Sequence, residues 1–286
     1  MTLFVSTAWS EYNERNIKDK IEEFILKGII NIELSGGADF YEGIESDILD
    51  LNDKYNLNFI LHNYFPPQKE DFVLNIASED ENNLKKSIDF VKKNINLASK
   101  FKSRLYTFHA GYAKKLNVTS KGYFKPDPGK IDWQKTYNTF YKSLDEILYF
   151  ATKKGVRIGI ENLFPFNEQE NYSIMCTIRE IEEMLFRYKD NKYLGLLIDF
   201  GHLNVAAHYM GFDRDKALDY LIAEYRDRIF EIHISDNGGS KDEHLPISEN
   251  GWQIKLIERY ELFDKPIVIE GMDLSFNLIN KISKRV

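Results

Sequence analysis

The chain has 286 residues, of which 43% are hydrophobic and 29% charged, and its formal net charge is −7. This acidic balance excludes a whole-surface attraction to nucleic acid or anionic membranes, although a local basic patch stays compatible with it. The single cysteine, Cys176, excludes an internal disulfide and a cysteine-based zinc site, and it fits a reducing compartment. No apolar run approaches the roughly 18 residues of a transmembrane helix, and the N-terminal segment lacks the basic region of a signal peptide. We therefore expect a cytoplasmic protein that acts on a small molecule, without a membrane or nucleic-acid partner.

Short apolar runs alternate with helix-period segments along the whole chain. Strands are predicted at residues 3–8, 29–34, 57–62, 104–109, 156–161, 194–199, 229–234 and 266–271. Their nearly continuous Val, Ile, Leu and Phe content is typical of parallel strands that are covered on both faces. The clearest predicted helix has one apolar stripe, formed by Leu84, Ile88, Val91, Ile95 and Ala98. Ser78 and Glu81 form a capping-box pattern before it, and a second stripe runs from Tyr137 to Ala151.

Eight strand–helix units without a linker predict an α/β fold, a single-domain (β/α)8 TIM barrel over residues 1–286. The alternative is a doubly wound open sheet, which would need a phosphate-binding glycine fingerprint after an early strand, and the chain has none. Two long segments, 112–131 and 235–251, follow the fourth and seventh predicted strands. Barrel enzymes carry their chemistry on this side of the strands, so we expect both segments to be active-site loops.

Imidazoles and carboxylates gather at the C-terminal ends of the predicted strands and in the segments that follow. They are His62, His109, Glu161, Asp199, His202, His233, Asp242, His244 and Glu270. Nitrogen and oxygen donors without sulfur suit Zn, Mn or Fe. The four carboxylates would raise one another's pKa values in a shared cleft unless cations neutralised them. The sequence therefore predicts a site for one to three divalent ions, with Zn or Mn favoured, while His208 and Cys176 are interpreted as structural residues.

Other residues near the strand ends have two interpretations each. Glu33 would either bind substrate hydroxyls or orient a ligand histidine from behind. Four aromatic residues would either stack on a sugar or pack in the core: Trp9, Tyr64, Phe65 and Phe164. The lysines of segment 112–131 would either meet an anionic group of the substrate or form a solvated face, and Lys121 and Lys125 are among them.

At these residues the chain resembles the xylose isomerase-like TIM-barrel superfamily, over essentially its whole length. The segments that carry the resemblance are LHNYFPP (61–67), NIAS (75–78), FHAGY (108–112), IGIENL (158–163), LLIDFGH (196–202), HISDNGGSKDEHLPISENG (233–251) and IVIEG (267–271). The pattern is that of sugar phosphate isomerase/epimerase-like proteins, which are similar to endonuclease IV-type apurinic/apyrimidinic endonucleases. Members often form dimers or tetramers, so a homo-oligomer is compatible with the resemblance, although the chain shows no dimer signature.

The two branches of this resemblance imply different sites. The isomerase/epimerase branch implies one divalent ion held by Glu161, Asp199, His233 and Glu270. In that branch Glu161 and Glu270 also move protons beside a carbonyl, through a cis-enediolate. The endonuclease branch implies three zinc ions, which add a further set of ligands: His62, His109, His202, Asp242 and His244. All nine positions are filled in this chain.

Several departures from the endonuclease pattern favour the isomerase/epimerase hypothesis over the endonuclease-like one. Gly201 stands where those enzymes have a cysteine, the run from His233 to Asn237 lacks their Asn and Lys, and the interval to Asp242 is shorter. We therefore favour a metal-dependent isomerase or epimerase of a small sugar, sugar phosphate or related polyol. A multinuclear zinc phosphoesterase is the alternative, and a metal-stabilised binding protein is the third hypothesis.

Overall fold

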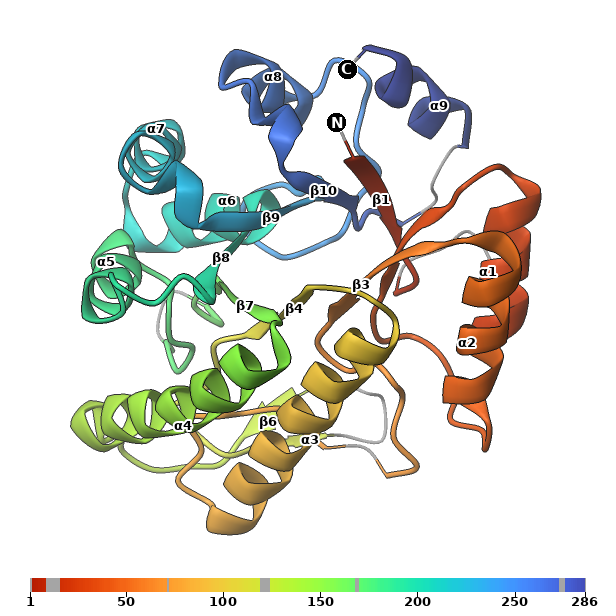
Figure 1. Ribbon diagram of the computed structural model, residues 1–286. Helices are drawn as coiled ribbons and strands as arrows, with labels where there is room; N and C mark the ends of the chain where they lie inside the picture. Colours follow the sequence, from red (N-terminus) through yellow and green to blue (C-terminus); the bar gives the residue numbers. More distant parts are fainter. Residues whose placement is uncertain are drawn as a thin grey trace.

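The computed structural model describes residues 2–8, 16–70, 72–118, 124–167, 170–272 and 276–285. Within these residues, parallel strands form a closed barrel and helices lie around its outside (Figure 1). The barrel strands are β1 (Thr2–Ser6), β2 (Asn31–Leu34), β3 (Asn58–His62), β4 (Leu105–His109), β7 (Arg157–Glu161), β8 (Leu194–Asp199), β9 (Ile229–Ile234) and β10 (Pro266–Ile269). Each overlaps a predicted strand, and the predicted closed barrel is confirmed.

The helices alternate with the strands as the sequence predicts, except that two of the described helices lie between β8 and β9. They are α1 (Ile17–Leu26), α2 (Ile44–Tyr55), α3 (Glu81–Lys100), α4 (Trp133–Lys154), α5 (Ile178–Arg187), α6 (Phe200–Met210), α7 (Arg214–Tyr225), α8 (Trp252–Arg259) and α9 (Phe276–Arg285). Two short 3-10 helices cover Arg226–Arg228 and Leu262–Asp264. Within the described ranges, none of the helices is both long enough and apolar enough to cross a membrane.

The order of the strands brings the predicted site residues to one end of the barrel. The order is β1-β10-β9-β8-β7-β4-β3-β2, and β1 pairs with both β10 and β2. Because every pair is parallel, the C-terminal ends of all these strands meet at one mouth. The register sets His109 beside Glu161 across β4 and β7, and Asp199 beside His233 across β8 and β9.

Below the mouth and the buried carboxylates Glu33 and Glu231, the barrel interior is apolar. Side chains two positions apart on a strand point to the same face, so Ile60 and Val268 point inward with His62 and Glu270. Ile60 and Val268 belong to a small buried cluster, whose other members are Phe4, Leu105 and Phe230. The larger apolar core lies between strands and helices. The ionisable residues therefore lie on an apolar floor that separates them from the opposite end of the barrel.

The start of α3 differs from the prediction. The capping box expected from Ser78 and Glu81 is wrong, because Asp80 is the N-cap residue. Its carboxylate accepts hydrogen bonds from the backbone N–H groups of Asn82 and Asn83. Ser78 instead accepts a hydrogen bond from the N–H of Asp80. A carboxylate at the N-cap position is favoured by charge-assisted bonds and by the helix dipole, and Ser78 lies too early in the chain to compete.

Both long segments after the strands contain local structure of their own. Segment 112–131 includes the antiparallel strands β5 (Leu116–Val118) and β6 (Phe124–Pro126). In segment 235–251, an antiparallel bridge between Asp236 and Leu245 closes a short loop. The side-chain amide of Asn237 donates to the carbonyl of Gly201 at 3.0 Å, which ties this loop to α6. The loop is thus held at the mouth by backbone and side-chain contacts.

Candidate functional site

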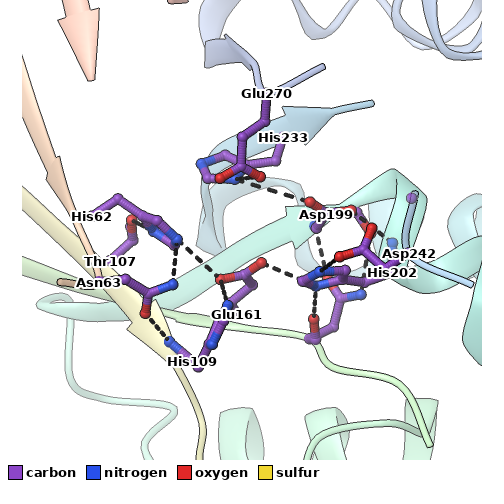
Figure 2. Close-up of polar contacts among 12 residues, drawn as sticks. His62, Asn63, Thr107, His109, Glu161, Asp199, His202, His233, Asp242 and Glu270 are labelled. Atoms are coloured by element: carbon purple, nitrogen blue, oxygen red, sulfur yellow. Dashed lines mark hydrogen bonds and ion pairs between the residues drawn. The ribbon is translucent and has the colours of Figure 1, made fainter. Parts of the chain in front are cut away.

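Glu161, the last residue of β7, lies between three imidazoles (Figure 2). Its Oε2 is 3.4 Å from Nε2 of His62 and 3.3 Å from Nε2 of His109. Its Oε1 is 3.0 Å from Nδ1 of His202. The two histidines ending β3 and β4 and the one near the start of α6 thus converge on one carboxylate. The parallel register produces this arrangement, because it brings residues more than 40 positions apart to the same edge.

Asn63 determines which ring nitrogen of His62 carries the proton. Oδ1 of Asn63 accepts the backbone N–H of His109 at 2.9 Å, so its Nδ2 is the atom that lies 2.6 Å from Nε2 of His62. An amide donor at this distance requires an unprotonated Nε2. The proton is then on Nδ1, which donates to Oγ1 of Thr107 at 2.9 Å. His62 is therefore held as the neutral tautomer with its proton on Nδ1 and with its Nε2 lone pair accepting from Asn63, and a metal ion at Nε2 would need this same tautomer.

A second group surrounds His233 on β9. Its Nδ1 is 3.1 Å from Oε2 of Glu270, which directly follows β10, and 4.0 Å from Oδ2 of Asp199. Its Nε2 lies 2.8 Å from Oε2 of Glu33 and 3.3 Å from Oε1 of Glu231. All five side chains are buried. One nitrogen of His233 therefore faces the mouth, and the other faces two carboxylates beneath it.

A third group joins the end of β8 to the loop closed by Asp236 and Leu245. Oδ2 of Asp242 lies 3.3 Å from Nε2 of His202 and 2.8 Å from Nε2 of His244. The other ring nitrogens point at backbone carbonyls: Nδ1 of His202 is 3.0 Å from the carbonyl of Asn162, and Nδ1 of His244 is 3.2 Å from that of Glu270. Carbonyl partners at Nδ1 hold its proton there, so both Nε2 atoms are directed at Asp242.

The clustered carboxylates attract positive charge. Burial raises the pKa of Asp199 to about 6. Burial alone would lower the pKa values of His202 and His233, but the surrounding carboxylates outweigh it and raise both well above the ordinary value. Burial likewise would raise the pKa of Glu270, yet His233 outweighs it and holds that pKa at about 2. Protons on the imidazoles thus supply positive charge that a divalent cation would supply in their place.

The donor atoms fit divalent cations. Several buried carboxylate oxygens make no hydrogen bond with any described residue: Oε1 and Oε2 of Glu161, Oδ2 of Asp199 and Oδ1 of Asp242. Burying a charged oxygen without a hydrogen-bond donor costs free energy unless a cation lies beside that oxygen. Donor atoms within 4.8 Å of one another form five groups: Glu33–His62–His233, His62–His109–Glu161, Glu161–Asp199–His202, Asp199–His233–Glu270 and His202–Asp242–His244. The nine predicted ligands all fall in these groups, and their nitrogen and oxygen chemistry suits Zn or Mn.

A cavity of about 620 Å³ opens beside the third group. His109, His202, Asp242 and His244 lie on one side of it. Phe164 also lines it, with its ring centroid 4.8 Å from that of His202. The candidate donors are therefore reachable from a space large enough for a small molecule.

The remaining predicted residues lie in different places. Glu33 is fully buried, and its Oε2 lies 2.8 Å from Nε2 of His233. Phe65 is part of the core, whereas the hydroxyl of Tyr64 accepts the N–H of Leu74 beside a separate hollow. The side chain of Lys125 is exposed on β6. Trp9 and Lys121 lie outside the described residues.

His208 and Cys176, which the sequence predicts to be structural, do not belong to the donor groups formed by described residues. His208 packs against Tyr209 in α6, with ring centroids 5.0 Å apart, and it joins none of the donor groups formed by described residues. Cys176 is buried, and its burial raises the pKa of its thiol well above the ordinary value. A buried thiol with a raised pKa is a poor nucleophile.

Sequence reasoning missed the residues that orient the donors. Glu231 lies two positions before His233 on the same strand face, and this spacing was a usable signal. Thr107 has the same relationship to His109 on β4. Asn162 gave no such signal, yet its side chain exchanges hydrogen bonds with the backbone of Asp199, at 2.8 Å and 3.1 Å. These contacts fix ring and carboxylate directions that the ligand residues alone do not.

Comparisons with known proteins agree with this architecture. MJ1614 of Methanocaldococcus jannaschii, described as uncharacterized, is 27% identical over 293 residues and the match covers 99% of each chain. A solved structure described as a D-tagatose 3-epimerase-like protein has a TM-score of 0.74 at 21% identity, covering 100% of this chain and 96% of that chain. YcjR from E. coli, a 3-keto-D-glucoside 4-epimerase, has a TM-score of 0.72 at 12% identity, covering 99% of each chain.

At these identities the solved structures establish a shared fold. A family model carries the assignment further, because it matches residues 32–272, which include the donors from Glu33 to Glu270. Its description is that of a xylose isomerase-like TIM barrel. The chain belongs to the xylose isomerase-like TIM barrel family.

Proposed function

We propose that the protein is a divalent-metal-dependent isomerase or epimerase that acts on a small sugar, sugar phosphate or related polyol through an enediolate. The observation that carries the proposal is the placement of two buried carboxylates around one set of donors. Glu161 on β7 and Glu270 after β10 come from strands that flank β8 and β9 in the barrel order. Asp199 and His233 lie on those two inner strands.

The chain's own residues would move the proton. A bound divalent cation would neutralise part of the carboxylate charge and hold neighbouring carbonyl and hydroxyl oxygens of the substrate. Glu161 and Glu270 would then act on the same substrate carbon, so that one removes a proton and the other returns one. His233 orients Glu270, and the three imidazoles around Glu161 orient that carboxylate. Charged His233 holds the pKa of Glu270 at about 2, and a bound cation would likewise favour the carboxylate form that a base needs.

The similar solved structures support this proposal. Both reported structures are described as epimerases or epimerase-like proteins, and their folds match essentially the whole of this chain. Those descriptions belong to those proteins. They favour sugar chemistry here because a shared barrel presents its strand ends to a substrate in the same arrangement.

Proton exchange tests the proposal directly. Metal-loaded protein would be incubated in D2O with ketoses, aldoses and their phosphates, and deuterium at the carbon beside the carbonyl would be followed by NMR. We expect exchange with the wild type, its loss in Glu161→Gln and Glu270→Gln, and its retention in Glu22→Gln, an exposed glutamate on α1. Metal content would be measured for each variant, so that loss of the ion is separated from loss of the base. Exchange that persists in both active-site variants would remove them from the mechanism.

A second candidate function rests on the third donor group. Proton transfer has no evident need for His202, Asp242 and His244, which form a group of their own. Three divalent ions against the four mouth carboxylates would leave a positive site that suits a phosphate ester, and a multinuclear zinc phosphoesterase would use it. Only this observation favours hydrolysis over isomerisation.

Metal stoichiometry separates the two candidates. Protein purified without added metal would be examined by elemental analysis, together with His244→Ala and the matched control His208→Ala. About three zinc ions per chain, reduced to about two only in His244→Ala, would favour the phosphoesterase. A single ion that is unaffected by His244→Ala but lost in Glu270→Ala would favour the isomerase.

A further inference from the structure

The cavity beside the donor groups is lined by both polar and apolar side chains. Its polar lining consists of the candidate donors His109, His202, Asp242 and His244, together with Ser173, Ser240 and Lys241. The rest of the lining, the apolar wall, comes from the segment after β4, the segment after β7, and α6. Its apolar and aromatic members are Tyr112, Leu116, Leu163, Phe164, Phe166, Tyr172, Val205 and Tyr209. A molecule that fills the cavity therefore contacts both these four donors and the apolar wall.

The aromatic rings of the wall pack on one another. The rings of Phe166 and Tyr172 have centroids 5.3 Å apart, and those of Tyr172 and Tyr112 are 6.4 Å apart. Tyr172 is 2% exposed, and its hydroxyl makes no hydrogen bond with any described residue. Phe166, in contrast, is 51% exposed at the rim. The wall is thus held in place by ring packing at Tyr172, and it presents the exposed ring of Phe166.

The polar groups of the wall are few and partly engaged. The hydroxyl of Tyr209 donates to the carbonyl of Ser240 at 2.6 Å, and that of Tyr112 lies 3.5 Å from Nδ1 of His109. Lys241 is the single lysine or arginine among the described lining residues, and its side chain is exposed. A free sugar carries a hydroxyl on nearly every carbon, and this wall would leave several of them without partners.

We propose that the substrate carries an apolar, ring-sized group, such as an aryl or alkyl aglycone, on the side away from its metal-chelating oxygens. This inference rests on the proposed function and names the substrate class of the same site. The chelating end lies at the donors that line the cavity, where His109 and His202 contact Glu161, and the apolar group lies against Leu116, Val205 and Phe166. Burial of that group supplies affinity, while the donors supply chemistry.

A pair of small chelators tests the inference by binding, without any turnover. Acetohydroxamate and 3-phenylpropionohydroxamate present the same two chelating oxygens, but only the second carries a ring. Both would be titrated into manganese-loaded and zinc-loaded protein by isothermal calorimetry. We expect the phenyl compound to bind about tenfold tighter or more, because its ring leaves water for the apolar wall.

Variants of the wall locate the ring. Phe166→Ala, at the rim, and Leu116→Thr should each reduce the phenyl preference several-fold, without changing acetohydroxamate binding. Phe186→Ala is the matched control, because Phe186 is a 72% exposed ring on α5 that does not line the cavity. Equal affinities for the two chelators, or a preference that both wall variants leave intact, would overturn the inference and leave the proposed function standing. Failure of both chelators to bind metal-loaded protein would overturn the proposed function and this inference with it.

Discussion

Asp199 is both the last residue of β8 and the N-cap of α6, and its Oδ1 accepts the backbone N–H of His202 at 2.7 Å. The strand therefore runs into the helix without a loop, and one side chain fixes the direction in which the next donor leaves the barrel. Its other oxygen, Oδ2, makes no hydrogen bond with a described residue and faces His233. Asp199 thus has a structural role through one oxygen and a candidate ligand role through the other.

Replacing Asp199 separates these two roles. Asparagine also caps helices, so Asp199→Ala should lower the free energy of unfolding by about 1 kcal/mol more than Asp199→Asn does. Both variants should lose metal affinity, at least about tenfold, because neither supplies the anionic oxygen. Urea unfolding of the metal-free proteins and competition with a chelating dye would measure the two effects. Equal stability of the two variants would show that the cap contributes nothing measurable.

Asn63 links two candidate ligands, and changing it should alter the tautomer of His62. Asn63 has a φ of 40°, which aspartate tolerates, and Asn63→Asp keeps an oxygen for the N–H of His109. It replaces the donor at Nε2 of His62 with an acceptor, so the proton should move to Nε2 or be present on both nitrogens. We expect metal affinity at the His62–His109–Glu161 group to fall about 10- to 100-fold.

Long-range 15N–1H NMR of the imidazoles would report this change in metal-free protein. The wild type should show His62 protonated on Nδ1 alone, and Asn63→Asp should not. Asn58→Asp, at an exposed position on the same strand, serves as the control for the added charge. An Nδ1-only tautomer that survives in Asn63→Asp would mean that Thr107 by itself holds the ring.

Metal removal should destabilise the fold. Without cations the mouth carboxylates repel one another, whereas a cation at about 100 times its Kd adds about 2.7 kcal/mol to the free energy of unfolding. Calorimetry in the presence of a chelator should therefore give a lower Tm than calorimetry with manganese or zinc, and re-addition of the ion should restore it. Glu161→Gln should respond less to the ion, since it lacks a carboxylate shared by two donor groups. A Tm that is independent of chelator would contradict a bound cation.

The strands were predictable because a strand covered on both faces must be apolar throughout. The run 57–62 becomes β3 (Asn58–His62), and the run 194–199 becomes β8 with the same bounds. The start of α3 was not predicted correctly, because two nearby residues, Ser78 and Asp80, both have side chains that are typical of an N-cap. Their competition is decided by where the backbone leaves the extended region, which no local pattern specifies.

The sequence by itself determined where the candidate donors gather. An ionisable residue at the C-terminal end of a parallel strand must reach the mouth of a closed barrel, whatever its neighbours are. This applies to His62, His109, Glu161, Asp199 and Glu270. The loop donors Asp242 and His244 followed from the long segment after β9.

Only the tertiary structure decided how those donors are directed and what faces them. The tautomer of His62 depends on Asn63 and Thr107, and the direction of His202 depends on the carbonyl of Asn162. The apolar wall joins Leu116 to Val205, far apart in the chain. Ring direction and cavity shape arise from contacts between distant residues, whose partners are chosen by packing rather than by sequence spacing.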